Sequence, residues 1–195
     1  MKKAEPLPWK DYFEHTKGKP PRPMLVKALG FVKSKNEALD FGSGALNDVI
    51  YLLSQGFKHV IALDKVAVAA EIAETLPADR FEYVISTFER FNFPKEKFDL
   101  INAQYALPFI SPDSFMRVFE DMHKSMNSGA ILVGQFFGDR DGWKDNKAMT
   151  FHSRAAVEGL LKDFKVIELQ EEEQDKKTAS GDMKHWHVFH FVVSK

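Results

Sequence analysis

Residues Ala38–Asp48 read ALDFGSGALND, in which an apolar run ends at Asp40 and two glycines, Gly42 and Gly44, follow it. Apolar residues then recur at the spacing of one helix face, at Leu46, Val49, Ile50 and Leu53. Glycine lets the backbone turn sharply and approach a ligand closely, and the N-terminus of the next helix presents free N–H groups. The stretch therefore predicts a strand, a turn that can hold a nucleotide-like cofactor, and a helix.

A second apolar strand is predicted from His59 to Asp64, after a helix stop at Gly56. Its last residue is an acid that lies about 20 residues beyond the glycines, where an acid can accept hydrogen bonds from a ribose diol. A glycine pair alone is a weak signal. A glycine pair between a strand and a helix, with an acid closing the next strand, is much more specific.

Together Asp40, Gly42, Gly44 and Asp64 resemble the first two motifs of the class I methyltransferases that depend on S-adenosylmethionine (SAM). The resemblance implies that the two glycines pass beneath the methionine part of SAM. It also implies that Asp40 lies close to the amino group of the cofactor and that Asp64 holds the ribose. The expected cofactor is therefore SAM, and the expected product is S-adenosylhomocysteine (SAH).

Two neighbours of these motifs, Ser43 and Lys65, are expected to contact the cofactor as well. The chain departs from the family at Leu46, where many members have a third glycine. The dinucleotide fingerprint of dehydrogenases would instead require a glycine at Asn47. A nicotinamide-dependent oxidoreductase and a glycine turn without a ligand therefore stay open as alternatives.

The composition fits one domain and gives no sign of a nucleic-acid partner. The chain has 195 residues, a formal net charge of -1 and no cysteine, so disulfides and thiolate metal sites are excluded. Its cations are spread along the sequence rather than clustered. Because the N-terminus lacks a signal-peptide core and no stretch is long enough to cross a membrane, we expect a cytoplasmic protein that binds neither membranes nor nucleic acid.

The segment 1–34 precedes the first strand, and we expect the methyltransferase domain to occupy residues 35–195. In this segment Trp9, Tyr12 and Phe13 share one face of a predicted short helix, and a proline-rich connection follows it. The helix can simply pack on the sheet. It can also act as a lid whose aromatic face covers a cationic cofactor, and the two interpretations are compatible.

The remaining strands complete an α/β pattern. Apolar strands are predicted at 81–85, 98–103, 130–137 and 164–169, and a last strand is predicted at 187–193. Residues 171–177 are highly charged, and we interpret them, with the turn-like stretch 178–183, as the connection of a C-terminal hairpin. The fold class expected from the resemblance is a Rossmann-like, mostly parallel seven-stranded sheet with an antiparallel last strand and helices on both faces.

Ligands of open α/β sheets lie at the carboxyl ends of the strands. Thr87 and Phe88 follow the third strand and are expected to face the adenine, although a phenylalanine at this point is more often simply a core residue. Asn102 and Ala103, at the end of the fourth strand, are expected at the cofactor. In the following loop, where class I methyltransferases begin to line the acceptor pocket, Tyr105 is a candidate catalytic group.

The C-terminal half resembles a narrower subgroup, the small bacterial methyltransferases of the tellurite-resistance type. The resemblance rests on the stretch 135–139, on Trp143 and on the stretch 184–189, and it implies a small or even inorganic acceptor. The clustered histidines allow three interpretations. The first is a metal site, which we do not expect because His190 points away from His185 and His187. The second is anchoring of the hairpin by Trp186 and His187, and the third is a pocket base or orienting group at His185 or His187.

The sequence thus predicts an enzyme that transfers a methyl group from SAM to a small-molecule acceptor by in-line displacement, acting as a monomer or homodimer. Tyr105 and His185 are its candidate catalytic groups, and no metal is expected. Two alternatives remain: a nicotinamide-dependent oxidoreductase, and a protein that binds SAM without transferring its methyl group.

Overall fold

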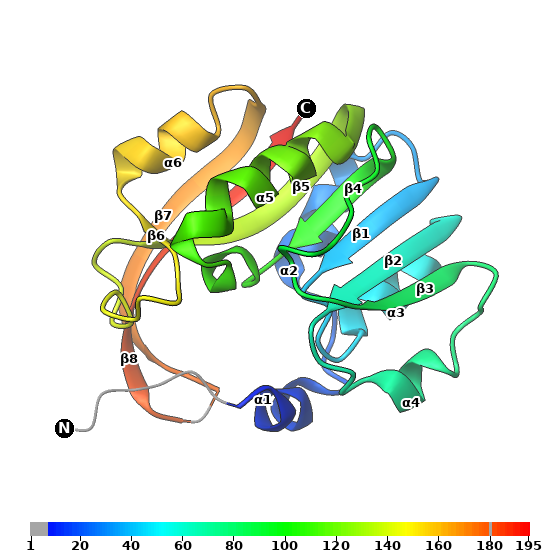
Figure 1. Ribbon diagram of the computed structural model, residues 1–195, viewed down its shortest axis with the longest axis horizontal. Helices are drawn as coiled ribbons and strands as arrows, with labels where there is room; N and C mark the ends of the chain where they lie inside the picture. The colour runs from blue at the N-terminus through cyan, green and yellow to red at the C-terminus, as the bar shows by residue number, and fades with distance from the viewer. Residues whose placement is uncertain (1–7, 180) are drawn as a thin grey trace.

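The computed structural model describes residues 8–179 and 181–195 (Figure 1). Seven strands follow one another in the order β3-β2-β1-β4-β5-β8-β7, and a short strand, β6, pairs with β5. Strands β1 to β5 are parallel to one another, whereas β8 is antiparallel to both of its neighbours. The strands are β1 Glu37–Phe41, β2 His59–Asp64, β3 Phe81–Ile85, β4 Phe98–Ala103, β5 Met126–Gly138, β6 Phe151–His152, β7 Lys165–Lys177 and β8 Met183–Ser194.

This arrangement confirms the predicted fold class. Helices cover both faces of the sheet, because successive residues of a strand point to opposite faces. In β1, Leu39 and Phe41 pack in the cluster that contains α5, while Ala38 packs on the other face with α2 and α3. The helices are α1 Trp9–Thr16, α2 Pro23–Ala28, α3 Asn47–Ser54, α4 Ala70–Ala73, α5 Pro112–Ser125 and α6 Arg154–Leu160, with short 3-10 turns η1 Leu29–Phe31 and η2 Leu107–Phe109.

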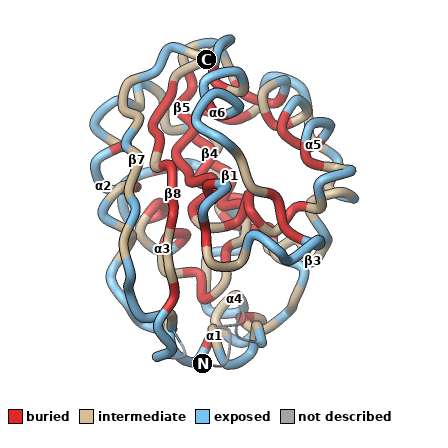
Figure 2. The backbone as a smooth tube through the Cα atoms, turned by 90° about the vertical axis from the view of Figure 1, so that its left-hand side faces the viewer, coloured by how far each residue is buried: buried red, intermediate tan, exposed pale blue. Residues whose placement is uncertain are grey.

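The buried segments gather in the central strands (Figure 2), as expected for parallel strands that are covered on both faces. The edge strand β7 is largely half-buried or exposed. In Figure 1 the β7–β8 hairpin curves down the left side until its tip lies near α1 at the bottom of the view. Helix α1, near the N-terminus, and the tip of the C-terminal hairpin therefore lie close together.

The C-terminal hairpin differs from its prediction. The charged stretch 171–177 belongs to β7 rather than to a connection, and β8 begins at Met183 rather than at His187. Charged side chains on an edge strand are compatible with pairing on its inner side, and they keep the outer edge from pairing with another chain. Cross-strand pairing with β8 along Lys165–Lys177 therefore overrides the low strand propensity of these residues.

Three smaller differences concern element ends. β5 already begins at Met126, whereas its prediction began at Ala130, and α4 is only one turn long. The two-residue strand β6 was not predicted. Of the predicted N-terminal segment 1–34, the first seven residues lie outside the described residues, as does residue 180 of the predicted turn. In the described ranges, no helix is long and apolar enough to span a membrane.

Candidate functional site

A cavity of about 240 Å³ lies at the carboxyl ends of the parallel strands. Its lining combines residues that follow β1 to β4 with residues of α1, the loop after β5 and the tip of the β7–β8 hairpin. Of the predicted site residues, it contains Gly42, Gly44, Asp64, Lys65, Thr87, Phe88 and Tyr105. The strand order thus brings together groups that are far apart in the sequence.

The glycine turn forms one wall of this cavity. Gly42 has φ +81°, and a Cβ built on it would lie 2.7 Å from the Cβ of Ala106. Gly44 has φ +49°, and a Cβ on it would meet no atom within 4 Å. Between them, Ser43 is buried, and its hydroxyl oxygen has no hydrogen-bond partner within the described residues. An open approach over Gly44 and an unpaired hydroxyl fit a polar ligand at this turn.

Leu46 keeps the conformation of the glycine that it replaces. Its φ is 60°, in the left-handed region that glycine adopts at low cost, and its side chain is fully buried. Its amide donates a hydrogen bond to the carbonyl of Ser43 at 2.9 Å. A leucine thus holds the left-handed conformation that the turn requires here, and burial of its side chain offsets the backbone strain.

Asp64 closes the turn from the neighbouring strand. Its two carboxylate oxygens accept hydrogen bonds from the amides of Gly44, at 2.9 Å, and Val66, at 3.1 Å. Each carboxylate oxygen can accept more than one hydrogen bond, so Asp64 retains capacity for the hydroxyls of a ribose. The acid that lies 20 residues from Gly44 thus contacts the glycine turn directly.

Four predicted cofactor residues, Asp40, Ser43, Asn102 and Ala103, are buried and lie outside the cavity lining. The amide nitrogen of Asn102 donates to Asp40 at 2.6 Å and to Asp48 at 3.0 Å. Burial, followed by the nearby Asp48 carboxyl, raises the pKa of Asp40 well above its ordinary value. The Arg22 guanidinium, 3.8 Å from Asp48, opposes this shift, and a cationic ligand near Asp40 would do the same.

The segment after β3 supplies Thr87 and Phe88 to the lining. The Phe88 ring stacks on Phe41 with centroids 3.9 Å apart, so it serves the core and the cavity together, and the two interpretations of this residue are both supported. After β2, the Lys65 ammonium lies 4.7 Å from the centre of the Trp9 ring. The aromatic ring that we expected to face a cationic cofactor therefore already contacts a protein cation.

The opposite half of the cavity is an aromatic chamber, which we define by the rings of Trp9, Tyr105, Phe109, Phe137, Trp143 and Trp186. Neighbouring rings contact one another edge-on or tilted, with centroids 4.9 to 6.4 Å apart. Tyr105 has φ 57°, a strained conformation of the kind that gathers at functional sites. Burial raises the pKa of its hydroxyl, so the group stays protonated at neutral pH.

Sequence reasoning did not identify Arg22, Phe109, Phe137 or Trp186 as site residues. Arg22 lies in a proline-rich connection and Trp186 in a stretch that we interpreted as an anchor, so neither stands in a recognisable motif. Of these four residues, Phe137 could best have been identified from the sequence, because it lies at the carboxyl end of a buried strand, where ligands of such sheets bind.

The end of α1 and the connection after it are joined to the first residues of α3 by three hydrogen bonds. The Asn47 side chain receives a hydrogen bond from the amide of Gly18 at 3.1 Å and donates one to the carbonyl of Thr16 at 2.8 Å. The amide of Arg22 donates to Asp48 at 2.9 Å. Since Asn47 and Asp48 begin the helix after the turn, the end of α1 is tied to the residues that shape the candidate cofactor site.

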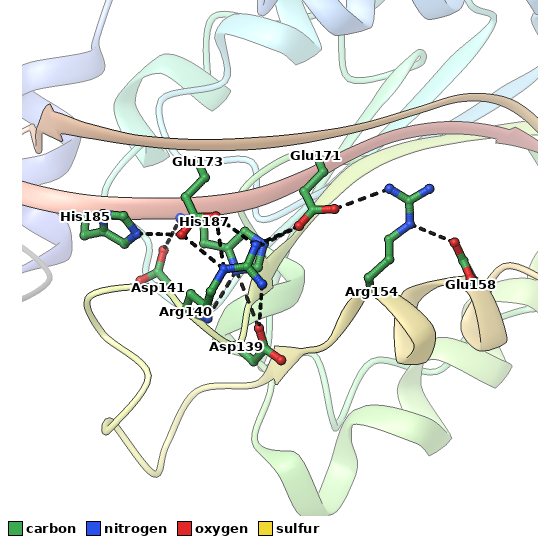
Figure 3. Close-up of polar contacts among 9 residues, drawn as sticks. All are labelled: Asp139, Arg140, Asp141, Arg154, Glu158, Glu171, Glu173, His185 and His187. Atoms are coloured by element: carbon green, nitrogen blue, oxygen red, sulfur yellow. Dashed lines mark hydrogen bonds and ion pairs between the residues drawn. The ribbon is translucent and has the colours of Figure 1, made fainter.

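His185 does not line the cavity, contrary to its prediction. Its ring contacts Glu173 at 3.0 Å (Figure 3). It also contacts Asp175 at 2.9 Å, and its side chain is 41% exposed. Because β8 begins earlier than predicted, His185 lies within the strand and points away from the face that presents Trp186 to the cavity. Those two carboxylates, Asp175 first, raise the pKa of His185 and suit it to a surface ion pair.

His187 holds the hairpin against β5. Its buried ring packs on Gly138, where any Cβ would collide with the imidazole. One ring nitrogen accepts the amide of Arg140 at 3.1 Å, and the other lies 2.9 Å from Glu171 (Figure 3). This supports the anchoring interpretation. Among the described residues, no group of three or more histidine, aspartate or glutamate side chains could hold a metal ion.

Comparisons with known proteins agree with this geometry. Residues 38–129 match the family model of a methyltransferase domain. No curated protein sequence matches the chain. Among solved structures, a Burkholderia thailandensis 1,6-didemethyltoxoflavin-N1-methyltransferase, with its substrate and SAH bound, is 19% identical, with a TM-score of 0.67 over 89% of this chain and 77% of that one.

Two further structures show the same fold. TehB from Haemophilus influenzae is 18% identical, with a TM-score of 0.75 over 96% of this chain and 67% of that one. A SAM-dependent methyltransferase from Methanosarcina mazei is 17% identical, with a TM-score of 0.68 over 91% of this chain and 99% of that one. At these identities the likeness shows the fold, so the acceptor has to be argued from the cavity itself.

Proposed function

We propose that this chain, a SAM-dependent methyltransferase with the class I fold, transfers the methyl group to a small-molecule acceptor held in the aromatic chamber. The observation that carries the proposal is that the glycine turn and the chamber belong to one cavity. Alignment of two reactants in one enclosed site is the main requirement for such a transfer. The cavity, about 240 Å³, is of a size for small molecules rather than for a segment of a macromolecule.

In this proposal the residues around the glycine turn hold the cofactor, which supplies an electrophilic methyl group on a sulfonium. Gly42 and Gly44 let the backbone approach it, and the unpaired Ser43 hydroxyl offers a hydrogen bond. The Asp64 carboxylate accepts hydrogen bonds from the ribose. The buried Asp40 favours a cationic amino group nearby, because a positive charge lowers the free-energy cost of ionising the Asp40 carboxyl.

Lys65, Thr87 and Phe88 are proposed to border the adenosine part, since they follow β2 and β3 at the cavity. Asn102 and Ala103 act from behind the wall, and Asn102 keeps Asp40 in place. In this proposal the predicted cofactor residues that line the cavity contact the cofactor, and the buried ones behind them support those contacts.

The chamber and α1 are proposed to orient the acceptor and to exclude water. Tyr105 borders the chamber at the end of β4 and can donate a hydrogen bond from its protonated hydroxyl. Trp9 on α1 lies over Phe109, with centroids 4.9 Å apart, so α1 acts as a lid over the site. We further propose that the protein works in the cytoplasm as a monomer or homodimer and needs neither nucleic acid nor membrane.

The experiment that tests this function measures turnover rather than binding alone. The protein is incubated with SAM and a panel of small acceptors, and SAH formation is followed by mass spectrometry. Acceptor-dependent SAH formation supports the proposal. Tight binding of SAH without turnover on any acceptor would favour a non-catalytic SAM-binding protein, and binding of NADH instead of SAH would favour the oxidoreductase.

A further inference from the structure

The aromatic chamber is surrounded by cations of the protein itself. The Arg22 guanidinium carbon lies 5.1 Å from the centre of the Tyr105 ring, and the Lys65 ammonium lies 4.7 Å from that of Trp9. Aromatic rings attract cations through the negative potential of their faces. These two rings are therefore already engaged by cations that the chain supplies.

Lys184 engages the other side of the chamber. Its ammonium is buried and lies 3.6, 4.2 and 4.7 Å from the ring centres of Trp186, Trp143 and Phe137. Its counter-ion is the equally buried Asp141, at 2.6 Å. Burial lowers the pKa of Lys184 to about 8 while Asp141 opposes the shift, so the amine remains mainly protonated at neutral pH.

The carboxylate of Asp141 has little capacity left to neutralise other charges. It also accepts hydrogen bonds from the amide of Trp143, at 2.9 Å, and from that of His187, at 3.2 Å. Five of the six chamber rings contact Arg22, Lys65 or Lys184, and among the described residues Phe109 alone has no cation over its ring. Rings whose faces are already engaged by the protein's own cations offer little attraction to a cationic guest in the chamber.

Within the described residues, the lining of the chamber offers no side chain suited to accept a proton. The titratable groups of the cavity lining are Tyr12, Arg22, Asp64, Lys65, Glu89 and Tyr105. The two carboxylates among them follow β2 and β3, on the cofactor side, and Asp64 is bound to two backbone amides. The hydroxyl of Tyr105 stays protonated, and behind its ring lie Glu172 and His190, which contact each other at 3.2 Å and are outside the lining.

From these contacts we infer that the acceptor is a small aromatic compound that binds as an anion, a thiolate or phenolate. This inference rests on the proposed methyltransferase function and names its substrate class. The flat apolar body packs among the rings, and the negative charge is balanced by the surrounding cations. Lys184 acts as a positioning residue, because it touches the rings rather than the reacting atoms.

The chemistry balances without a protein base. The acceptor releases its proton to water before it binds. In the transfer, a lone pair of the acceptor sulfur or oxygen forms the bond to the methyl carbon, while the bond from that carbon to the sulfonium sulfur breaks and its electron pair stays on sulfur. The products are a neutral thioether or ether and SAH, and no proton moves within the site.

A pH series tests the origin of the nucleophile. The probes are 4-nitrothiophenol, thiophenol and 4-nitrophenol, which ionise at different pH, with benzylamine as the cationic comparison. We expect kcat/KM to rise with pH and to level off at the pKa of each acceptor, with no transfer to benzylamine. A single inflection shared by all acceptors would assign the proton to a protein group and overturn the inference, as would methylation of benzylamine at a comparable rate.

A variant tests the role of Lys184. Lys184→Met is expected to lower kcat/KM for the thiolates by roughly tenfold while the Kd for SAH stays within about twofold of the parent. Binding is read independently from quenching of tryptophan fluorescence by 4-nitrothiophenol in the SAH complex, since all three tryptophans line the cavity. Lys176→Met, a change to an exposed lysine on the same hairpin, is the matched control and leaves both quantities unchanged.

Lys184→Gln replaces the methionine variant in this test if that variant is unstable, because the glutamine amide can still donate a hydrogen bond to Asp141 without carrying a charge. Retention of full thiolate affinity and kcat/KM in both variants would overturn the inference. The inference would also be overturned if the parent protein binds SAH but no thiolate quenches the fluorescence of that complex and none is methylated with SAM. Failure of the parent protein to bind SAH at all would instead overturn the proposed function, so the two failures are distinguishable.

Discussion

At the scale of single residues, the two glycines of the turn have different physical roles. Gly42 is required by its neighbour, because a Cβ would press against Ala106 at 2.7 Å, and also by its positive φ. Gly44 has only the positive φ, and the space beside it is open. The first glycine therefore serves the fold as well as the site, whereas the second serves mainly the ligand.

Alanine at each position separates these roles. Gly42→Ala should lower the free energy of unfolding by about 2 to 4 kcal/mol, through strain and overpacking. Gly44→Ala should lower it by only about 1 to 2 kcal/mol, but weaken SAH by roughly tenfold or more. Urea unfolding and calorimetric titration measure the two quantities. A Gly44→Ala protein that binds SAH as tightly as the parent would contradict the assigned role.

His152 makes stability depend on pH. Burial lowers the pKa of its ring to about 4, and the ring lies between Phe115 and Phe136. A histidine whose pKa is lower in the folded than in the unfolded state binds its proton more readily when unfolded. Its contribution to stability is therefore intact above about pH 6.5 and is lost as the pH falls toward 4, by up to about 3 kcal/mol.

The His152→Phe variant should remove most of this loss, and urea unfolding at pH 7.5 and pH 5 measures it. The pKa values of His123 and His190 are also lowered by burial, so a smaller loss of the same sign should remain. An unchanged difference between the two pH values in the variant would show that His152 does not carry the effect.

At the scale of elements, the sequence predicts what local spacing controls. The turn after β1, the acid that closes β2 and the presence of the first five strands follow from periodicity and glycine positions, whereas the spatial order of the strands does not. The positions of Arg22 and Trp186 depend on contacts between distant segments, which no local pattern encodes. His185 was misplaced because a strand whose start shifts by a few residues changes which side chains face the site.

The contact between β5 and β8 depends on one glycine. Gly138→Ala should cost about 1 to 3 kcal/mol or more, because its Cβ would collide with the His187 ring. In the background of His187→Ala the same change should cost much less, so a double-mutant cycle should give a favourable coupling. Strictly additive losses would contradict the packing described here.

Helix α1 should be held over the site by Asn47. Asn47→Ala removes hydrogen bonds to Thr16 and Gly18, and amide exchange in Trp9–Thr16 should accelerate by roughly fivefold to thirtyfold. Ser54→Ala, at the other end of α3, is the control, because its hydroxyl bonds to Tyr51 and Gln55 at that end of the helix and not to α1. Equal exchange of α1 in both variants would remove the basis for a lid.

At the scale of the whole molecule, the residues of the proposed cofactor and acceptor sites lie together at the carboxyl ends of the parallel strands. The parallel strands bring the glycine turn, Asp64 and Tyr105 to their carboxyl ends, and the antiparallel hairpin adds Trp186 from the opposite side. The polar groups for a cofactor and the rings for an acceptor therefore border one cavity. The central claim is that the first half of that cavity binds an adenosyl cofactor.

The most direct test is calorimetric titration of the parent protein, Asp64→Asn and Asp79→Asn with SAH, with NADH titrated alongside. Asp79 is an exposed acid away from the cavity, so its variant is the matched control. We predict that the parent and Asp79→Asn bind SAH alike, that Asp64→Asn binds it more weakly by roughly tenfold to a hundredfold, and that none binds NADH. Equal SAH affinity of Asp64→Asn and the parent, or binding of NADH in place of SAH, would contradict the account.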